Sequence, residues 1–278
     1  MPKFIQRALR ITSTDLPFSG TFDGGGLVVS GAYINASESF QGLFGKIGMY
    51  SKKAELRNLG VRSSYIKGGG AVGGLAGVSY GTVSGCYSTA WVAGAETLVG
   101  GLVGNLGGNA TIINSYSTGI VSGDSIVGGL AGENRGSIGN SYSASKVSGK
   151  AMAGGLAGLN YGIIANSYSS GAVSGDSIAG GLAGASVGEI VNSYSIGTVA
   201  GNSEAGGLVG KNMLWKEGIV KSSYYSIETS GQSDTGKGEP KTMEELKHLP
   251  TFAGWDFDSI WQIDEKANDG YPYLRGLL

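Results

Sequence analysis

A block of two glycines, a leucine and a small residue recurs through most of the chain at intervals of 26 to 28 residues. The leucines of the successive blocks are Leu75, Leu102, Leu130, Leu156, Leu182 and Leu208. A repeat of this length is one supersecondary unit, which cannot bury its apolar face alone and must stack on its neighbours. The interval therefore predicts an elongated repeat domain.

Two further blocks recur in the same phase. Asn-Ser-Tyr-Ser begins at Asn114, Asn140, Asn166 and Asn192, and Val-(Ser/Ala)-Gly begins at Val92, Val121, Val147, Val173 and Val199. The segments are too short for helices and rich in β-branched and aromatic residues, and glycine between them permits tight corners. We therefore predict an all-β parallel β-helix (β-solenoid) with about three short strands per turn, in which equivalent residues stack ~4.8 Å apart.

Composition agrees with a folded core despite the glycine content. Glycine accounts for 53 of 278 residues, but there are only 5 prolines, no three-residue collagen period, and 41% of residues are hydrophobic. Enough apolar surface is present to bury a core.

Charge and cysteine content exclude several classes of protein. The formal net charge is −1 and 15% of residues are charged, which argues against a nucleic-acid partner and gives no polybasic membrane signal. No apolar run is long enough for a membrane-spanning helix, and the first residues lack the apolar core of a signal peptide. Cys86 is the only cysteine, so no intrachain disulfide is expected.

The two ends of the chain depart from the repeat, and we divide the chain accordingly. We expect an N-terminal cap and first turns over 1–50, the repeats over 51–225 and a C-terminal cap over 226–278. Within the first region, Arg7 to Leu16 alternates weakly and is a candidate edge strand.

The C-terminal cap is expected to contain a loop, one short helix and an aromatic cluster. Ser230 to Glu239 is polar and glycine-rich, and Thr242-Met243-Glu244-Glu245 is a capping-box pattern, so a helix should run from near Pro240 to Leu249. Bulky aromatic residues follow, and we expect them to seal the last turn rather than form a sugar-binding patch. They are Trp255, Phe257, Trp261, Tyr271 and Tyr273.

Candidates for catalysis or metal binding are sparse. His248 is the only histidine, which leaves no histidine metal cluster, and Cys86 takes the position of Ser115 in the next repeat, as a small packed residue would. Asp124 and Asp176 share a turn position two turns apart, with Lys150 between them. That spacing is wide for paired carboxylates or a calcium ladder. We therefore predict no enzyme activity, no catalytic residues, no cofactor and no metal.

Two columns of identical residues allow alternative interpretations. The asparagines at 114, 140, 166 and 192 favour a ladder of amide side chains bonded from turn to turn. The alternative is that each asparagine simply forms a turn. A column of tyrosines either faces the core or, as we slightly prefer, faces outward as a ligand-binding stripe. Its members are Tyr87, Tyr116, Tyr142, Tyr168 and Tyr194.

These blocks resemble the GLUG-repeat family of bacterial surface proteins. Phe18 to Gly26 resembles the lead-in strand of such domains, and Thr251 to Phe257 and Gly270 to Leu274 resemble their ending. The resemblance implies a secreted or cell-surface structural or adhesive module within a larger bacterial chain, without catalytic residues of its own. A host or matrix glycan or protein would be its partner.

Two other functions are weighed against this expectation. One is a carbohydrate-active β-helix enzyme or a glycan-binding module. The other is ice binding by flat Ser-x-Ser columns, which the bulky tyrosines disfavour because they interrupt the small polar rows.

Overall fold

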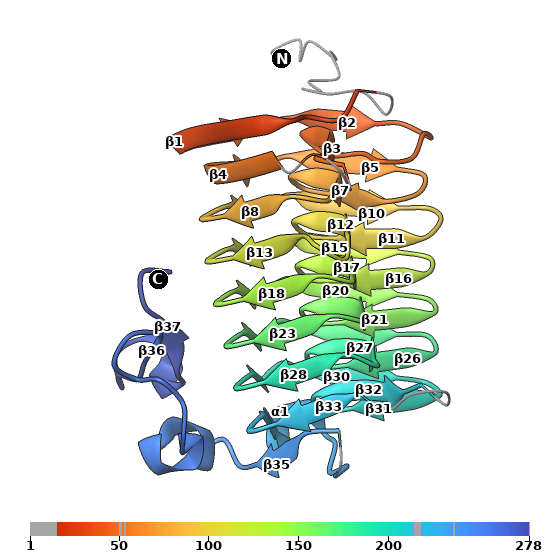
Figure 1. Ribbon diagram of the computed structural model, residues 1–278. Coiled ribbons are helices and arrows are strands. Elements are labelled where there is room, and N and C mark those ends of the chain that lie inside the picture. The colour runs from red at the N-terminus through yellow and green to blue at the C-terminus, as the bar shows by residue number, and fades with distance from the viewer. Residues whose placement is uncertain (1–15, 50–51, 53, 214–217, 236, 278) are drawn as a thin grey trace, which may run out of the picture.

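The structure is a computed structural model that describes residues 16–49, 52, 54–213, 218–235 and 237–277. Figure 1 shows short strands stacked turn upon turn into a rod, from β1 at one end to β33 at the other. All strand pairs along the rod are parallel, and one antiparallel pair, β36 (Trp261–Gln262) with β37 (Tyr273–Leu274), lies outside it. The predicted all-β parallel β-solenoid is confirmed.

Four sheets run along the rod. The first sheet has two branches that meet at β4, because β4 is long enough to pair with both β8 and β9. One branch holds β1 (Gly20–Ser30), β4 (Ala54–Arg62), β8 (Thr82–Ser84), β13 (Thr111–Ile113), β18 (Ser137–Gly139), β23 (Ile163–Ala165), β28 (Glu189–Val191) and β33 (Ile219–Lys221). The other holds β9 (Tyr87–Ser88), β14 (Tyr116–Ser117), β19 (Tyr142–Ser143), β24 (Tyr168–Ser169), β29 (Tyr194–Ser195), β34 (Tyr224–Ser226) and β35 (Glu239–Lys241).

The other three sheets are single columns. The second sheet is β2 (Tyr33–Asn35), β5 (Tyr65–Gly68), β10 (Trp91–Gly94), β15 (Ile120–Gly123), β20 (Lys146–Gly149), β25 (Val173–Gly175) and β30 (Val199–Gly201). The third is β6 (Val72–Gly73), β11 (Leu98–Gly100), β16 (Ile126–Gly128), β21 (Met152–Gly154), β26 (Ile178–Gly180) and β31 (Glu204–Gly206). The fourth is β3 (Phe44–Ile47), β7 (Ala76–Ser79), β12 (Val103–Leu106), β17 (Ala131–Asn134), β22 (Ala157–Asn160), β27 (Ala183–Ser186) and β32 (Val209–Asn212).

The turns from β8 to β32 contain five short strands each rather than the three expected. In residues 82–106, for example, the chain passes through β8, β9, β10, β11 and β12. The Asn-Ser-Tyr-Ser block is divided because its asparagine adopts a left-handed conformation, with φ of 50° at Asn114 and 45° at Asn140. Asparagine tolerates this conformation better than other non-glycine residues.

The turn interpretation of these asparagines therefore holds, and the predicted amide ladder at their positions was wrong. A hydrogen-bonded amide ladder lies instead on the fourth sheet. There Asn134 Nδ2 donates to Asn160 Oδ1 over 2.7 Å, and Asn160 Nδ2 donates to Ser186 Oγ over 3.1 Å.

Like residues stack on like along the inside of the rod. Ile112 pairs with Ile138 and Val121 with Val147, and the block leucines are completely buried. Burial of apolar surface stabilises such a core by about 25 cal/mol per Å².

The serines of the Asn-Ser-Tyr-Ser block also lie inside. Ser141 Oγ accepts a hydrogen bond from the Ser115 amide and donates one to the Gly139 carbonyl, and this arrangement repeats from turn to turn. Ser117 and Ser143 are buried as well. The Ser-x-Ser columns are thus part of the interior, which removes the surface on which ice binding would depend.

A short helix and a loop cover the C-terminal end of the rod. Helix α1 (Ile227–Ser230) is capped by the Ser226 side chain and by Gly231 in a left-handed conformation. In the loop that follows, the Asp234 carbonyl accepts a hydrogen bond from the Tyr225 hydroxyl, and the Asp234 carboxylate accepts one from the Gly207 amide. The predicted edge strand at Arg7 to Leu16 lies outside the described residues except for Leu16, which is exposed.

The predicted capping box forms, but the helix behind it does not. Thr242 and Glu245 exchange the two expected hydrogen bonds between side chain and backbone amide. Two single 3-10 turns follow, η1 (Glu245–Lys247) and η2 (Leu249–Phe252), with His248 in an extended conformation between them. Pro250 lies in the first positions of the second turn. The N–H groups at the start of a helical turn have no acceptor within it, so a proline there loses no hydrogen bond.

Candidate functional site

The tyrosine column faces away from the core of the rod. Successive rings from Tyr87 to Tyr194 stack with centroids 4.9 to 5.0 Å apart and interplanar angles of 3° to 9°. The neighbouring serines, such as Ser117, point inward and are buried. The preferred outward direction is therefore correct, and its cause is a left-handed bend two residues before each tyrosine, at Gly85 in the first repeat and at an asparagine in the next four.

The C-terminal segment, residues 242–277, covers one end of this column. Figure 1 shows the segment at the side of the rod, near β23 and β28. Tyr168 and Tyr194 are 2% and 0% exposed, and they form one apolar cluster with Phe252, Trp255 and Trp261. A third short turn, η3 (Asn268–Gly270), belongs to the same segment.

We expected the C-terminal aromatic residues to seal the last turn. They contact Tyr224 of that turn, but they also extend along the side of the rod over the tyrosines of earlier turns. Trp261 lies 5.9 Å from Tyr194 and Trp255 lies 6.3 Å from it, measured between ring centroids. They thereby bury the outward rings of Tyr168 and Tyr194.

Burial raises the pKa of the phenols progressively along the column. Desolvation raises the pKa of Tyr116 and raises that of Tyr142 to about 12. It also raises the pKa of Tyr194 well above the usual phenol value, and there the hydroxyl donates a hydrogen bond to the Pro272 carbonyl. Only Tyr87, Tyr116 and Tyr142 retain partial exposure, so a ligand-binding role remains a prediction for these three and is wrong for Tyr168 and Tyr194.

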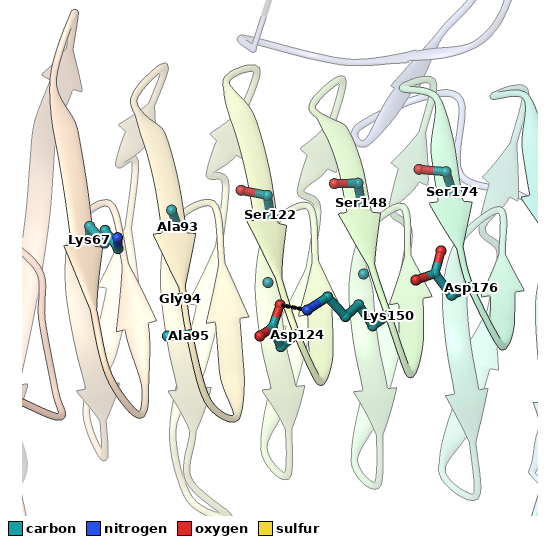
Figure 2. A pocket seen from close by; sticks show the side chains of 12 residues that line it. Lys67, Ala93, Gly94, Ala95, Ser122, Asp124, Ser148, Lys150, Ser174 and Asp176 are labelled. Carbon is teal, nitrogen blue, oxygen red and sulfur yellow. Dashed lines mark ion pairs between the residues drawn. The ribbon is translucent and has the colours of Figure 1, made fainter. Parts of the chain in front are cut away.

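A groove of about 390 Å³ lies on the outer face of the second sheet. Its floor is a row of small side chains, Ala93, Ser122, Ser148 and Ser174, which the strand register places beside one another. Figure 2 shows the three serines in line, with Asp124, Lys150 and Asp176 along the turns that follow and Lys67 at the other end.

Asp124 and Asp176 stand two turns apart, as the sequence predicted. Lys150 lies between them and its Nζ is 2.9 Å from Asp124 Oδ1, which raises the pKa of the lysine chiefly through that hydrogen bond. The lysine and aspartate side chains are 66% and 50% exposed, so solvent screens the pair and it adds little to stability. Two turns separate the carboxylates by ~10 Å, beyond the spacing of the carboxyl pair in most glycosidases.

The remaining single candidates lie apart from the groove. Cys86 is buried, its Sγ lies 3.3 Å from the Ser84 carbonyl oxygen, and burial raises its pKa to about 11. A thiol in this state is a poor nucleophile. His248 is exposed and its Nε2 contacts Glu244 Oε1 at 2.9 Å. Within the described ranges, no group of three or more histidine, cysteine, aspartate or glutamate side chains gathers in a way that could hold a metal ion.

Sequence reasoning missed a row of exposed aromatic residues beside the groove. Tyr33, Tyr65 and Trp91 are directly paired across β2, β5 and β10. The sequence did contain a signal for this row, because the residue before each inward valine or isoleucine of the second sheet must face outward. In successive turns that residue is Tyr33, Tyr65, Trp91, Ile120 and Lys146.

Two stretches of the repeats match a known family model. The family model of the GLUG motif matches residues 95–122 and 151–174. A protein of Evansella cellulosilytica, provisionally named a glycine-rich membrane protein, is 48% identical over 61 residues, which are 21% of this chain and 7% of that protein. Halomucin of Haloquadratum walsbyi is 34% identical over 104 residues, which are 37% of this chain and 1% of halomucin. The aligned part of this chain thus spans a small fraction of these relatives.

A solved structure has the same fold. A protein of Bacteroides ovatus, provisionally described as an immunoglobulin A1 protease, superimposes with a TM-score of 0.57 and 19% sequence identity over 95% of this chain and 79% of that one. At this identity the likeness concerns architecture alone. In the part of the chain that the structure describes, no helix has the length and apolar character needed to cross a membrane.

Proposed function

Since the chain carries GLUG motifs in two of its turns, we propose that it is a non-catalytic structural and adhesive repeat module of a bacterial cell-surface protein. The module forms part of a longer chain and holds binding surfaces on a stiff rod. Its relatives support this assignment, because the aligned repeats make up 7% and 1% of their lengths, as expected of one module among others.

The proposal rests on one observation: most of the side chains that recur in every repeat have a structural role in the rod. The leucine, valine and isoleucine columns form the core, the serine column bonds to backbone amides, and each tyrosine stacks on the next. Side chains conserved between repeats are therefore occupied by the fold. On the outer face of the second sheet, the row that begins at Tyr33 differs from turn to turn, and this row can meet a partner.

A matrix-adhesion assay tests the proposal. The purified chain is immobilised and challenged with arrays of glycans and matrix proteins, while the same preparation is incubated with acidic and neutral polysaccharides and assayed for reducing ends. We expect saturable binding and no release of product.

Product release would contradict a non-catalytic role and support the enzyme alternative, for which Asp124 and Asp176 would be the first residues to replace. Absence of binding to every glycan and protein would contradict the adhesive role. Asp124→Asn distinguishes the two further, because it should leave the fold and binding to a neutral partner unchanged while abolishing any turnover that depends on that carboxylate.

A further inference from the structure

One end of the second sheet presents three aromatic side chains to solvent. Tyr33 and Trp91 are 44% and 52% exposed. The rings of Tyr33 and Tyr65 stack with centroids 5.3 Å apart, and Trp91 meets Tyr65 edge-to-face at 5.3 Å with an interplanar angle of 89°. The solenoid does not require this row, because the equivalent position holds Lys146, Ala172 and Thr198 in later turns.

The aromatic row borders the polar groove. Two residues further along the same strands, on the same face, stand Lys67, Ala93, Ser122 and Ser148. The face therefore combines a half-exposed indole with hydroxyl groups and a shallow hollow. Apolar platforms beside a few fixed polar groups are typical of ligand sites.

Two lysines stand on the strands of this face, and the acidic residues Glu38 and Glu96 lie at the corner beyond, where their backbone groups bond to Gly69. Lys67 and Lys146 are exposed, and among the residues that the structure describes neither is assigned an ion pair. The nearby Asp124 is already paired with Lys150. Asp176 stands at the far end of the groove, two turns beyond Asp124. The face thus complements a ligand that carries negative charge.

We propose that this face, defined by Tyr33, Tyr65, Trp91, Lys67 and Lys146, binds an acidic oligosaccharide. The proposal rests on the adhesive function proposed above and assigns that function its ligand class. The indole of Trp91 packs against the C–H face of a sugar ring. Lys67 and Lys146 pair with uronate carboxylates, and the serine hydroxyls of the groove exchange hydrogen bonds with sugar hydroxyls.

Calorimetric titration with oligogalacturonate and with oligoalginate tests the proposal, and methyl-esterified oligogalacturonate serves as the uncharged probe. We expect the acidic probes to bind and esterification to weaken binding by about tenfold, because the two lysines lose their partners. Trp91→Ala should weaken binding by about tenfold, and Lys67→Ser and Lys146→Ser by about two- to fivefold each.

Matched control variants separate the face from general effects. Ile163→Ala removes an exposed apolar side chain on the first sheet, and Lys266→Ser removes an exposed lysine in the C-terminal segment. Both should bind like the unaltered chain. Far-ultraviolet circular dichroism and the thermal midpoint establish that each variant is folded.

The outcomes distinguish the acidic-oligosaccharide site on this face from the general proposal that the chain is an adhesive module. Equal affinity for the acidic and esterified probes, or undiminished binding by Trp91→Ala, would overturn the assignment of this face while leaving an adhesive role intact. Failure of both acidic probes to bind would overturn it too, and binding of the chain to a matrix protein would then still support the adhesive module.

Discussion

The hydroxyl of Tyr194 donates a hydrogen bond to the backbone carbonyl of Pro272, which lies 78 residues further along the chain. This bond fastens the C-terminal segment to the outer side of the rod, inside a cluster from which water is excluded. The side chain of Asn268 donates to the same carbonyl over 3.0 Å, so that carbonyl has a second partner.

Replacing this tyrosine tests how firmly the segment is attached. Tyr194→Phe should lower the free energy of unfolding by about 1 kcal/mol, because the hydrogen bond is lost while Asn268 still satisfies the carbonyl. Chemical denaturation followed by tryptophan fluorescence measures the change, since Trp255 and Trp261 pack against the ring. Tyr33→Phe, at an exposed position, should leave stability unchanged; an equal loss in both variants would refute the argument.

Two glycines of one repeat should respond in opposite ways to alanine. A Cβ at Gly128 would lie 1.8 Å from the Ala131 carbonyl oxygen and 2.5 Å from the Gly158 amide nitrogen, where backbone must move. A Cβ at Gly139 would meet nothing within 4 Å, and the equivalent residues Ile113 and Ala165 carry side chains.

We therefore expect Gly128→Ala to destabilise the fold by about 3 kcal/mol or more. Gly139→Ala should stabilise it by ~0.4–1 kcal/mol, because alanine restricts the unfolded chain. Denaturation midpoints of the two variants give the comparison. Similar midpoints would mean that the turns are not packed as closely as the structure has them.

The serine ladder should be sensitive to the loss of a single hydroxyl. In Ser141→Ala the buried amide of Ser115 loses its acceptor and the Gly139 carbonyl loses a donor, so the free energy of unfolding should fall by about 1–3 kcal/mol. Ser137→Ala, on the outer side of the same turn, is the control and should be nearly neutral. Amide hydrogen exchange at Ser115 should accelerate only in the first variant, and unchanged exchange would count against the ladder.

The tyrosine column should make the protein sensitive to alkali. An unfolded phenol titrates near pH 10, whereas the pKa of Tyr142 is about 12 in the folded chain and that of Tyr194 is raised well above the usual phenol value. Above about pH 10 the unfolded state therefore binds fewer protons than the folded state, so the free energy of unfolding falls as the pH rises through this window.

Phenolate absorbance and denaturation at several alkaline pH values measure this effect. Tyr116, toward the uncovered end, should ionise before Tyr142, and Tyr168 and Tyr194 only as the fold is lost. Tyr142→Phe should weaken the pH dependence. Ionisation of Tyr142, Tyr168 and Tyr194 near pH 10 with the fold intact would show that this part of the column is not buried.

Sequence by itself determined the solenoid and its register. The 26-residue interval aligns Ile112 with Ile138 and Val121 with Val147, and each such pair depends only on residues one turn apart. The left-handed bend at the asparagines is also determined locally, because asparagine itself tolerates that backbone conformation.

Only the tertiary structure decided which surfaces are open. The covering of Tyr194 by Pro272 and Trp261 joins segments more than sixty residues apart, and no periodic pattern specifies that approach. The aromatic row at Tyr33 and Trp91 likewise emerges only when the strands are stacked, because these residues occupy a position that no repeat conserves. The repeat specifies the interior by recurrence, whereas the surface depends on residues that do not recur.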